Sequence, residues 1–477
     1  MPAPTQNRTE TTTGPTGPNG PSRPNGTDLP VLSRADTARL LGTALGPIVA
    51  QGVIARRPKV VAAAGRLGTD DRSVRLLQRL RDRYGDGPVR VPAPGRPSAL
   101  VLDAAGVRRV LEDGPEPFTP ASWEKGGALG HFQPHGVLIS QGTARAERRR
   151  FNEAVLDTGS PLHAQAGDIA AVVRQETGQL RDDAVRTGAF DWDAFVVTWW
   201  RIVRRIVLGD GAREDHELTD TLTRLRRRGN WSHLAPRSEQ LRERFASGVR
   251  SHLRQAEEGS LAARIAQTAP EPDDGTTPED QIGHWLFAWD PGAAVTLRAL
   301  ALLATHPEVR GRARAEMAAD GPADRPRELS VLRSAVLEST RLWPTTPLLI
   351  RESTADTDWP GGTLPAGTSL LVPTWFLHRD DRRRADADRL DVQQWLDGSA
   401  RDDWMLTPFS GGHAACPGQE LVLFVASTVL ATLLEDHHAV LLPPESFDAG
   451  QPLPRGLNPY ALRFGLARAA GGTGLER

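Results

Sequence analysis

The chain has little of several residue types that would mark particular classes of protein. It has 477 residues but a single cysteine, Cys416, so no disulfide can form within the chain. A zinc or iron–sulfur site with several cysteine ligands is excluded for the same reason. One cysteine suits a reducing compartment, and we expect a cytoplasmic location. The formal net charge is −1, which gives no electrostatic reason to expect a nucleic-acid or membrane partner.

Long apolar runs and targeting segments are also missing. Residues 1–30 are mostly Pro, Gly, Thr and Asn, which predicts a disordered tail. This segment lacks the basic and apolar regions of a signal peptide. The longest apolar stretch, Leu421 to Leu434, is too short to cross a bilayer and is typical of a buried helix.

The rest of the chain carries mainly helical periodicity. Hydrophobic residues make up 39% and charged residues 25%, as in a folded domain with a sizeable core. We expect mainly α structure with a minor β region: one large domain over residues 31–470 and a C-terminal tail over 471–477. Helices are expected over 34–84 with a break at 46–47, 143–259, 277–306, 327–343 and 417–434, a hairpin near 89–102 and a small sheet over 350–374.

The cysteine lies in a glycine-rich loop just before an apolar helix. The segment from Phe409 to Gly418 reads Phe-x-x-Gly-x-x-x-Cys-x-Gly. Glycines let the backbone approach a flat partner, and a helix N-terminus is expected to lower the thiol pKa. A lone cysteine is more often a buried structural residue. This long spacing, however, resembles the haem-binding signature of the cytochrome P-450 family, of the soluble bacterial type.

The resemblance implies a cytochrome P-450-like haem domain whose cofactor is haem b (iron protoporphyrin IX). Cys416 would be the axial metal ligand, with Phe409, His413 and Gly418 around it. A second motif supports the family: Glu338 and Arg341 share one face of an expected helix. A surface ion pair would explain them equally well, but their flanks are apolar, and they resemble the family's buried Glu-x-x-Arg core. Gln394 stands where the family has an arginine as third partner.

Haem carboxylates need cationic partners, and three arginines are candidates. Arg351 matches a propionate-binding arginine of the family. Arg145 and Arg149 match the family's His-x-x-x-Arg pair, although a solvated basic face is the alternative interpretation. Ala414 occupies the usual basic position two residues before the cysteine, so His413 would have to supply that contact.

The helix expected over 277–306 would pass over the haem and carry the groups that deliver protons to bound oxygen. The family's small residue, acid and alcohol fall at Ala288, Asp290 and Pro291, so the alcohol is missing. Pro291 also removes one helix hydrogen bond. A packing kink of no chemical consequence is one interpretation, and altered proton delivery is the other. An acid here would also repel a substrate carboxylate and favour a basic substrate group.

The leading hypothesis is a cytochrome P-450 monooxygenase that oxidises a small organic molecule in specialised-metabolite biosynthesis. Because no dinucleotide or iron–sulfur motif is present, electrons would come from a separate ferredoxin and ferredoxin reductase, or peroxide would replace them. The second hypothesis is a haem-thiolate enzyme that uses peroxide or catalyses a rearrangement or nitrene-type transfer, and the third is a haem sensor or carrier. We expect a monomer whose substrate pocket includes Ala288, Trp289 and Leu349.

Overall fold

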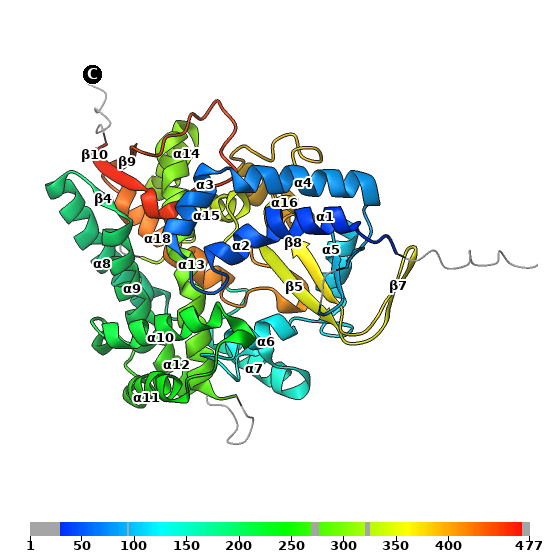
Figure 1. Ribbon diagram of the computed structural model, residues 1–477. Coiled ribbons are helices and arrows are strands. Elements are labelled where there is room, and N and C mark those ends of the chain that lie inside the picture. The colour runs from blue at the N-terminus through cyan, green and yellow to red at the C-terminus, as the bar shows by residue number, and fades with distance from the viewer. Residues whose placement is uncertain (1–28, 93–94, 269–275, 320–324, 470–477) are drawn as a thin grey trace, which may run out of the picture.

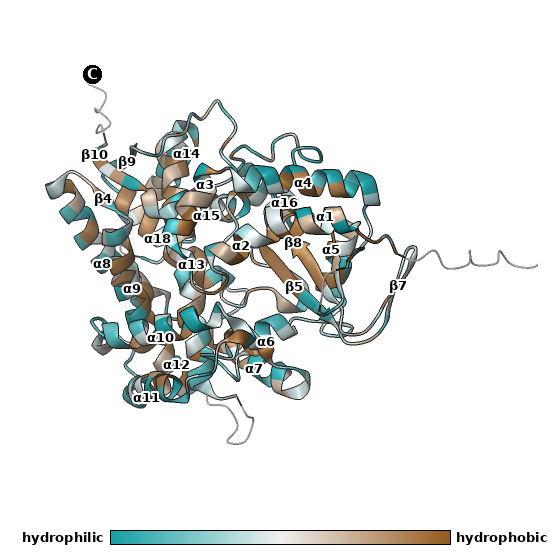
Figure 2. Cartoon of the chain, in the orientation of Figure 1, coloured by the Kyte–Doolittle hydropathy of each residue, from teal (hydrophilic) through white to brown (hydrophobic). Residues whose placement is uncertain are grey.

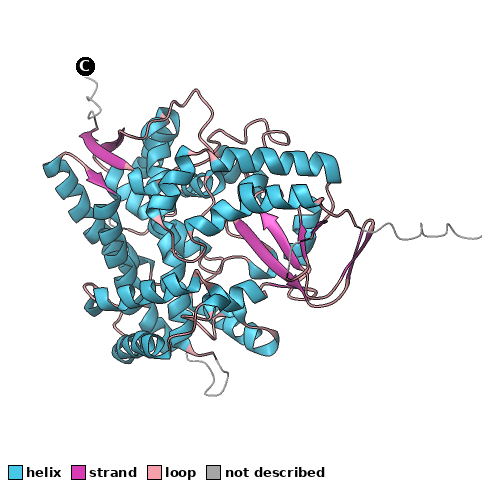
Figure 3. Ribbon diagram, viewed as in Figure 1, coloured by secondary structure: helices cyan, strands magenta, loops and turns pink. Residues whose placement is uncertain are grey.

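The computed structural model describes residues 29–92, 95–268, 276–319 and 325–469. Helices dominate and the strands gather at two edges (Figures 1 and 3). The longer helices are α4 (Thr69–Tyr84), α7 (Gly142–Val155), α8 (Ala166–Thr187), α9 (Trp192–Leu208), α10 (His216–Gly229), α11 (Glu239–Gln255), α13 (Pro278–Thr305), α14 (Pro307–Ala319), α15 (Ser330–Leu342) and α18 (Gln419–Leu434). The shorter ones are α1 (Arg34–Arg39), α2 (Gly46–Gln51), α3 (Pro58–Arg66), α5 (Ala104–Glu112), α6 (Trp123–Leu129), α12 (Leu261–Gln267), α16 (Thr374–Leu377) and α17 (Gln393–Leu396).

Helix α13 forms the axis of the helical body. It packs against α9, α15 and α18, and most of its side chains are buried. Helix α18 is also buried around most of its circumference, as expected for helices that are apolar on every face. Surface helices differ: α4 buries one stripe that includes Val74, Leu77 and Leu80, and its other face is hydrophilic (Figure 2).

A five-stranded sheet in the order β1-β2-β8-β5-β3 packs beside the helical body. Its strands are β1 (Val89–Val91), β2 (Ser98–Leu100), β3 (Phe118–Thr119), β5 (Leu348–Ser353) and β8 (Ser369–Pro373). Strand β2 pairs parallel with β8, and the other pairs are antiparallel. The smaller sheets contain β4 (Phe190–Asp191), β10 (Arg463–Arg468) and β9 (His437–Leu442), and β6 (Thr357–Trp359) with β7 (Gly362–Leu364).

Two hydrophobic clusters result from this arrangement. The larger one fills the helical body around α8, α9, α13, α15 and α18. The smaller one lies between the five-stranded sheet and helices α4 and α5. Strand β5 alternates buried and half-buried residues, so Leu349 and Arg351 point to the same side.

The expected fold class is confirmed: the structure is mainly α with a minor β region. The helix expected over 277–306 is α13, which runs continuously through Pro291. The helix expected from residue 417 begins at Gln419, because Pro417 and Gly418 form the turn before it. Residues 1–28 and 470–477, which carry almost all of the expected tails, lie outside the described residues.

Within the described ranges, one helix is long and apolar enough to cross a membrane. This helix is α13, and 67% of its most apolar window is buried inside the protein. It is therefore accounted for as the central core helix.

Candidate active site

Cys416 lies in the turn between a short 3₁₀ segment, Gly412–Ala414, and α18. Its backbone N–H donates to the Phe409 carbonyl at 2.9 Å, which closes the loop. Gly412 has a φ of 60°, and a Cβ atom there would lie 1.9 Å from the Leu111 carbonyl oxygen. Only glycine fits this position, because it tolerates both the left-handed backbone and the close approach of α5.

The thiol of Cys416 does not have the lowered pKa that its position before a helix suggests. Burial raises its pKa, and the Gly418 N–H and the Arg149 guanidinium only partly oppose this. The expectation of a lowered pKa was therefore wrong for the protein alone, since desolvation outweighs the helix terminus. A bound metal ion reverses this balance, because coordination deprotonates a thiol.

Three cations surround the same loop without a carboxylate partner. Arg351 is 2% exposed and Arg145 is 6% exposed, and the third cation is Lys125 of α6, which sequence analysis missed. None of the three forms an ion pair with any residue in the described part of the chain. Their known partners are neutral oxygens.

The contacts of these cations place them at the cysteine loop and strand β5. Arg351 donates to the Ser410 hydroxyl at 2.9 Å, and Arg145 to the His413 carbonyl at 3.1 Å. Lys125 Nζ donates to the Pro120 carbonyl at 2.8 Å and the Ile350 carbonyl at 3.0 Å. The Nε atoms of Arg145 and Arg351 are buried and have no hydrogen-bond partner.

Burial and mutual repulsion disfavour the charged forms of this cluster. Burial, followed by the charge of Arg145, lowers the pKa of Arg351 to about 10. Burial, followed by the charge of Arg351, lowers the pKa of Lys125 well below its usual value. Buried cations of one sign cost free energy unless an anion joins them. The cluster therefore fits the carboxylates of a haem whose iron is bound by Cys416.

The other expected carboxylate partners are less suitable. Arg149 Nε donates to Glu153 at 2.6 Å, and its NH1 group donates to the Ala415 carbonyl at 2.7 Å, so this guanidinium already has an acidic partner. His413 lies near Arg145 and Arg351, and burial, followed by these charges, lowers its pKa to about 4. A neutral imidazole can donate a hydrogen bond but adds no positive charge.

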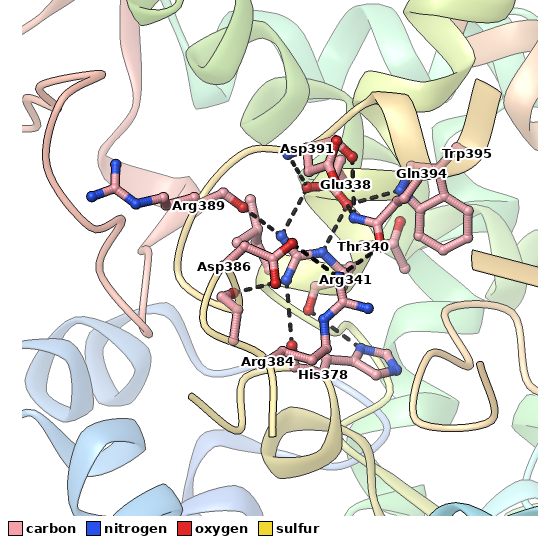
Figure 4. Close-up of polar contacts among 12 residues, drawn as sticks. Glu338, Thr340, Arg341, His378, Arg384, Asp386, Arg389, Asp391, Gln394 and Trp395 are labelled. Atoms are coloured by element: carbon pink, nitrogen blue, oxygen red, sulfur yellow. Dashed lines mark hydrogen bonds and ion pairs between the residues drawn. The ribbon is translucent and has the colours of Figure 1, made fainter. Parts of the chain in front are cut away.

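The Glu338–Arg341 pair of α15 is completely buried, with 0% exposure of both side chains. Arg341 donates two hydrogen bonds to the Glu338 carboxylate, at 2.7 and 2.8 Å. Gln394 and Trp395 donate to the same carboxylate at 2.9 and 2.8 Å, as Figure 4 shows. Thus Gln394 serves as a neutral third partner.

Arg341 also fixes the chain that follows the sheet. It donates to the carbonyls of Ala387 at 2.8 Å and Arg389 at 2.6 Å, so it joins α15 to the segment that precedes the cysteine loop. Burial opposes its charge, but the adjacent Glu338 carboxylate raises the pKa of Arg341 above the usual value. The pair therefore stays ionised.

On α13, the expected catalytic acid is held in an ion pair. Asp290 Oδ2 accepts a hydrogen bond from Arg226 of α10 at 2.6 Å, and Arg226 also donates to the Ile54 carbonyl at 2.9 Å. Sequence analysis missed Arg226, because α10 carries several arginines and nothing in the spacing selects one. Because Arg226 neutralises the Asp290 carboxylate, Asp290 is not expected to repel a substrate carboxylate.

A cavity of about 550 Å³ lies beside this part of α13. Phe287, Asp290, Pro291, Ala294 and Arg298 line it from α13, and their spacing follows one face of the helix. Ala288, Trp289 and Leu349 do not line this cavity. The expectation that these three residues line the pocket therefore does not hold for this cavity. The side chain of Trp289, for example, points to α9 and packs edge-on against Trp199.

No group of three or more His, Cys, Asp or Glu side chains that could hold a metal ion is found among the described residues.

Comparison with known proteins points to one family. A sequence profile described as cytochrome P450 matches residues 290–452, which include α15 and the cysteine loop. This part of the chain is similar to the cytochrome P450 family. Its fold is similar to that of the retinoic acid bound cyanobacterial CYP120A1, with a TM-score of 0.67 at 19% identity over 82% of this chain and 94% of that one.

Curated relatives match over shorter segments. The chain is 32% identical over 208 residues to cyclooctat-9-en-7-ol 5-monooxygenase of Streptomyces melanosporofaciens, which is 41% of this chain and 44% of that protein. It is 34% identical over 125 residues to ferruginol synthase of Salvia pomifera, covering 25% and 28%. These matched segments span less than half the length of either relative.

Proposed function

We propose that this protein is a haem-thiolate monooxygenase of the cytochrome P450 type that oxidises a small organic molecule, in specialised-metabolite biosynthesis in the cytoplasm. The observation that carries the proposal is the group of Lys125, Arg145 and Arg351 against the cysteine loop, none of which forms an ion pair with a described residue. The names of two relatives, a cyclooctat-9-en-7-ol 5-monooxygenase and a ferruginol synthase, support a small organic substrate.

The chain's own residues would divide the work of holding the cofactor. Cys416 would ligate the iron of haem b, and Arg145, Arg351 and Lys125 would bind the carboxylates. When bound, haem supplies the dioxygen and one-electron chemistry, which a thiolate ligand promotes by donating electron density. Arg149 would lie near the sulfur, where its positive charge favours the thiolate.

Electrons would come from a separate ferredoxin and ferredoxin reductase. Arg148 and Arg150 of α7 have half-buried and exposed side chains, respectively, on the helix that also carries Arg149. A basic surface there would suit an acidic ferredoxin.

A second function is favoured by one specific feature, the oxygen side of α13. Pro291 has no hydroxyl to hold water, and the Asp290 carboxylate is paired with Arg226. Proton transfer through Asp290 would require this ion pair to open. A reaction that uses peroxide, or a rearrangement or nitrene-type transfer, would not need proton transfer through Asp290.

Haem binding tests the main proposal. Purified protein supplied with haem should bind one equivalent, and its reduced carbon monoxide complex should show the strongly red-shifted Soret band of thiolate ligation. Cys416→Ala should lose that band but still bind haem weakly through the cationic cluster. Wild-type protein that takes up no haem would refute the assignment.

The electron source separates the two functions. Product that forms only with NAD(P)H, a ferredoxin system and dioxygen supports monooxygenation. Product that forms with peroxide alone, or without any oxidant or reductant, supports the second function.

A further inference from the structure

The cavity beside α13 is lined by more positively charged than negatively charged side chains. Five arginines and two aspartates line it: Arg56, Arg226, Arg227, Arg298, Arg455, Asp70 and Asp290. Two of these arginines are already neutralised. Arg226 is paired with Asp290, and Arg455 is paired at 2.9 Å with Asp381 and Asp388.

Arg56 and Arg298 have no ion pair with any described residue. Arg56, from the loop between α2 and α3, donates to the Thr345 carbonyl at 2.9 Å. Arg298, near the end of α13, donates to the carbonyls of Trp343 at 3.1 Å and Leu457 at 2.6 Å, and its buried Nε atom has no partner. Both cations are thus held in place by neutral oxygens and have no carboxylate within ion-pair distance among the described residues.

The groups around these two cations do not remove the imbalance. Burial is the largest influence on Arg298 and lowers its pKa to about 10; Tyr460 and Asp70 oppose this shift, and the nearby Arg56 charge adds to it. Burial also raises the pKa of Asp70, the lining carboxyl within electrostatic range of both arginines. Asp70 lies farther than 4 Å from both guanidinium groups, because no ion pair joins it to either one. Tyr460 adds a phenol to the same end of the cavity.

The remaining lining is mostly apolar and includes several aromatic rings. Trp192 and Trp200 of α9, Phe287 of α13, and Trp343 and Trp375 contribute, and Tyr460 packs edge-on against Trp192 at 4.7 Å between ring centroids. Apolar walls with a few polar groups at one end are typical of a site that fixes the orientation of its ligand.

We propose that this cavity binds an organic acid, with its carboxylate on Arg56 and Arg298 and its apolar body along the aromatic wall. The binding of the acid stands on the cavity alone, whereas its oxidation rests on the proposed function. Arg298 lies seven residues, or about 10 Å along the helix axis, beyond Pro291, where the oxygen-side position falls. The oxidised atom would therefore lie roughly 10 Å from the carboxylate.

The test compares matched acids and amides on the haem-loaded protein. The probes are ω-phenylalkanoates from four to eight chain carbons and their neutral amides, with binding measured by calorimetry so that turnover is not required. We expect at least one acid to bind about tenfold more tightly than its amide, which is about 1.4 kcal/mol. Arg56→Gln and Arg298→Gln should each remove most of that preference.

Controls separate a binding role from a structural one. Arg224→Gln, an exposed arginine of α10 that does not line the cavity, removes the same charge and should keep the preference. Arg298 also joins three segments through carbonyls, so its substitution can impair folding. Arg56 has one such contact and provides the second variant, and Arg298→Lys keeps the charge and should retain part of the preference.

The proposal is overturned if no acid of the series binds more tightly than its amide, or if the preference survives in both glutamine variants. A failure of the haem assignment looks different, because it removes the Soret band and leaves the calorimetric preference for acids unchanged.

Discussion

At the scale of single residues, Lys125 should affect the haem-free protein and the haem-bound protein in opposite ways. Its ammonium group is buried between backbone carbonyls beside Arg351, so it costs stability when no anion is present. Sequence analysis found Cys416, Arg145 and Arg351 because each belongs to a spaced motif. Lys125 belongs to none, and only the packing of α6 on β5 brings it to the cluster.

The variant Lys125→Met should therefore have opposite effects on the two states. The haem-free protein should melt at a higher temperature, since a buried uncompensated charge is removed. Haem affinity should fall about tenfold or more, the equivalent of about 1.4 kcal/mol. The matched control is Lys59→Met, because Lys59 is exposed and should alter neither quantity. Equal behaviour of the two variants would exclude Lys125 from the haem site.

Pro291 permits a test of the oxygen side. Because Arg226 holds the Asp290 carboxylate, adding a hydroxyl with Pro291→Thr should not raise the amount of product formed per NAD(P)H consumed. We also expect poor coupling in the wild type. Both are measured with a ferredoxin system and with peroxide. Tight coupling in the wild type would show that Pro291 affects only packing and that protons arrive by another route.

At the scale of secondary-structure elements, α15 depends on one buried ion pair. Removing Arg341 leaves the Glu338 carboxylate buried, and breaking such a pair costs about 3–5 kcal/mol. Arg341→Ala should therefore give little folded protein, as measured by chemical unfolding. The control is Arg186→Ala on α8, where Arg186 and Asp183 are also three residues apart but are 72% and 66% exposed. That exposed pair contributes only about 0–1 kcal/mol.

Sequence analysis predicted elements best where one physical signal dominated. The extent of α13 follows from the helix-start residues Pro278, Glu279 and Asp280 and the mainly apolar residues after them. The small sheet follows from its Gly and Pro punctuation. The beginning of α18 was placed two residues too early, because Pro417 suits both a first helical turn and the turn before it. The face of α13 that lines the cavity was not predictable: a helix that is apolar on every side gives no direction, and Trp289 consequently points away from the cavity.

At the scale of the whole molecule, buried histidines predict how stability changes with pH. Burial is the largest cause that lowers the pKa of His284 to about 4 and that of His378 to about 3. The unfolded chain, with an ordinary histidine pKa near 6.5, binds more protons than the folded chain between these values. Stability therefore falls as the pH decreases below about 6.5, by up to about 1.4 kcal/mol per pH unit for each histidine.

Urea unfolding at pH 7 and pH 5 measures this effect. His284→Gln should make the free energy of unfolding less dependent on pH. The control variant is His216→Gln, which replaces a histidine whose side chain is 58% exposed. A wild type that is equally stable at both pH values would show that these histidines are protonated without loss of the fold.

The two hydrophobic clusters have a consequence for cooperativity. Cys416 leads into α18, which belongs to the cluster of the helical body, and Arg351 extends from β5, whose neighbouring residues belong to the cluster of the sheet. A single cofactor bound by both residues would join the two cores. Without it, each core can melt on its own, so calorimetry should resolve two transitions. With it, the cores are coupled through the ligand, and the molecule should unfold as one unit.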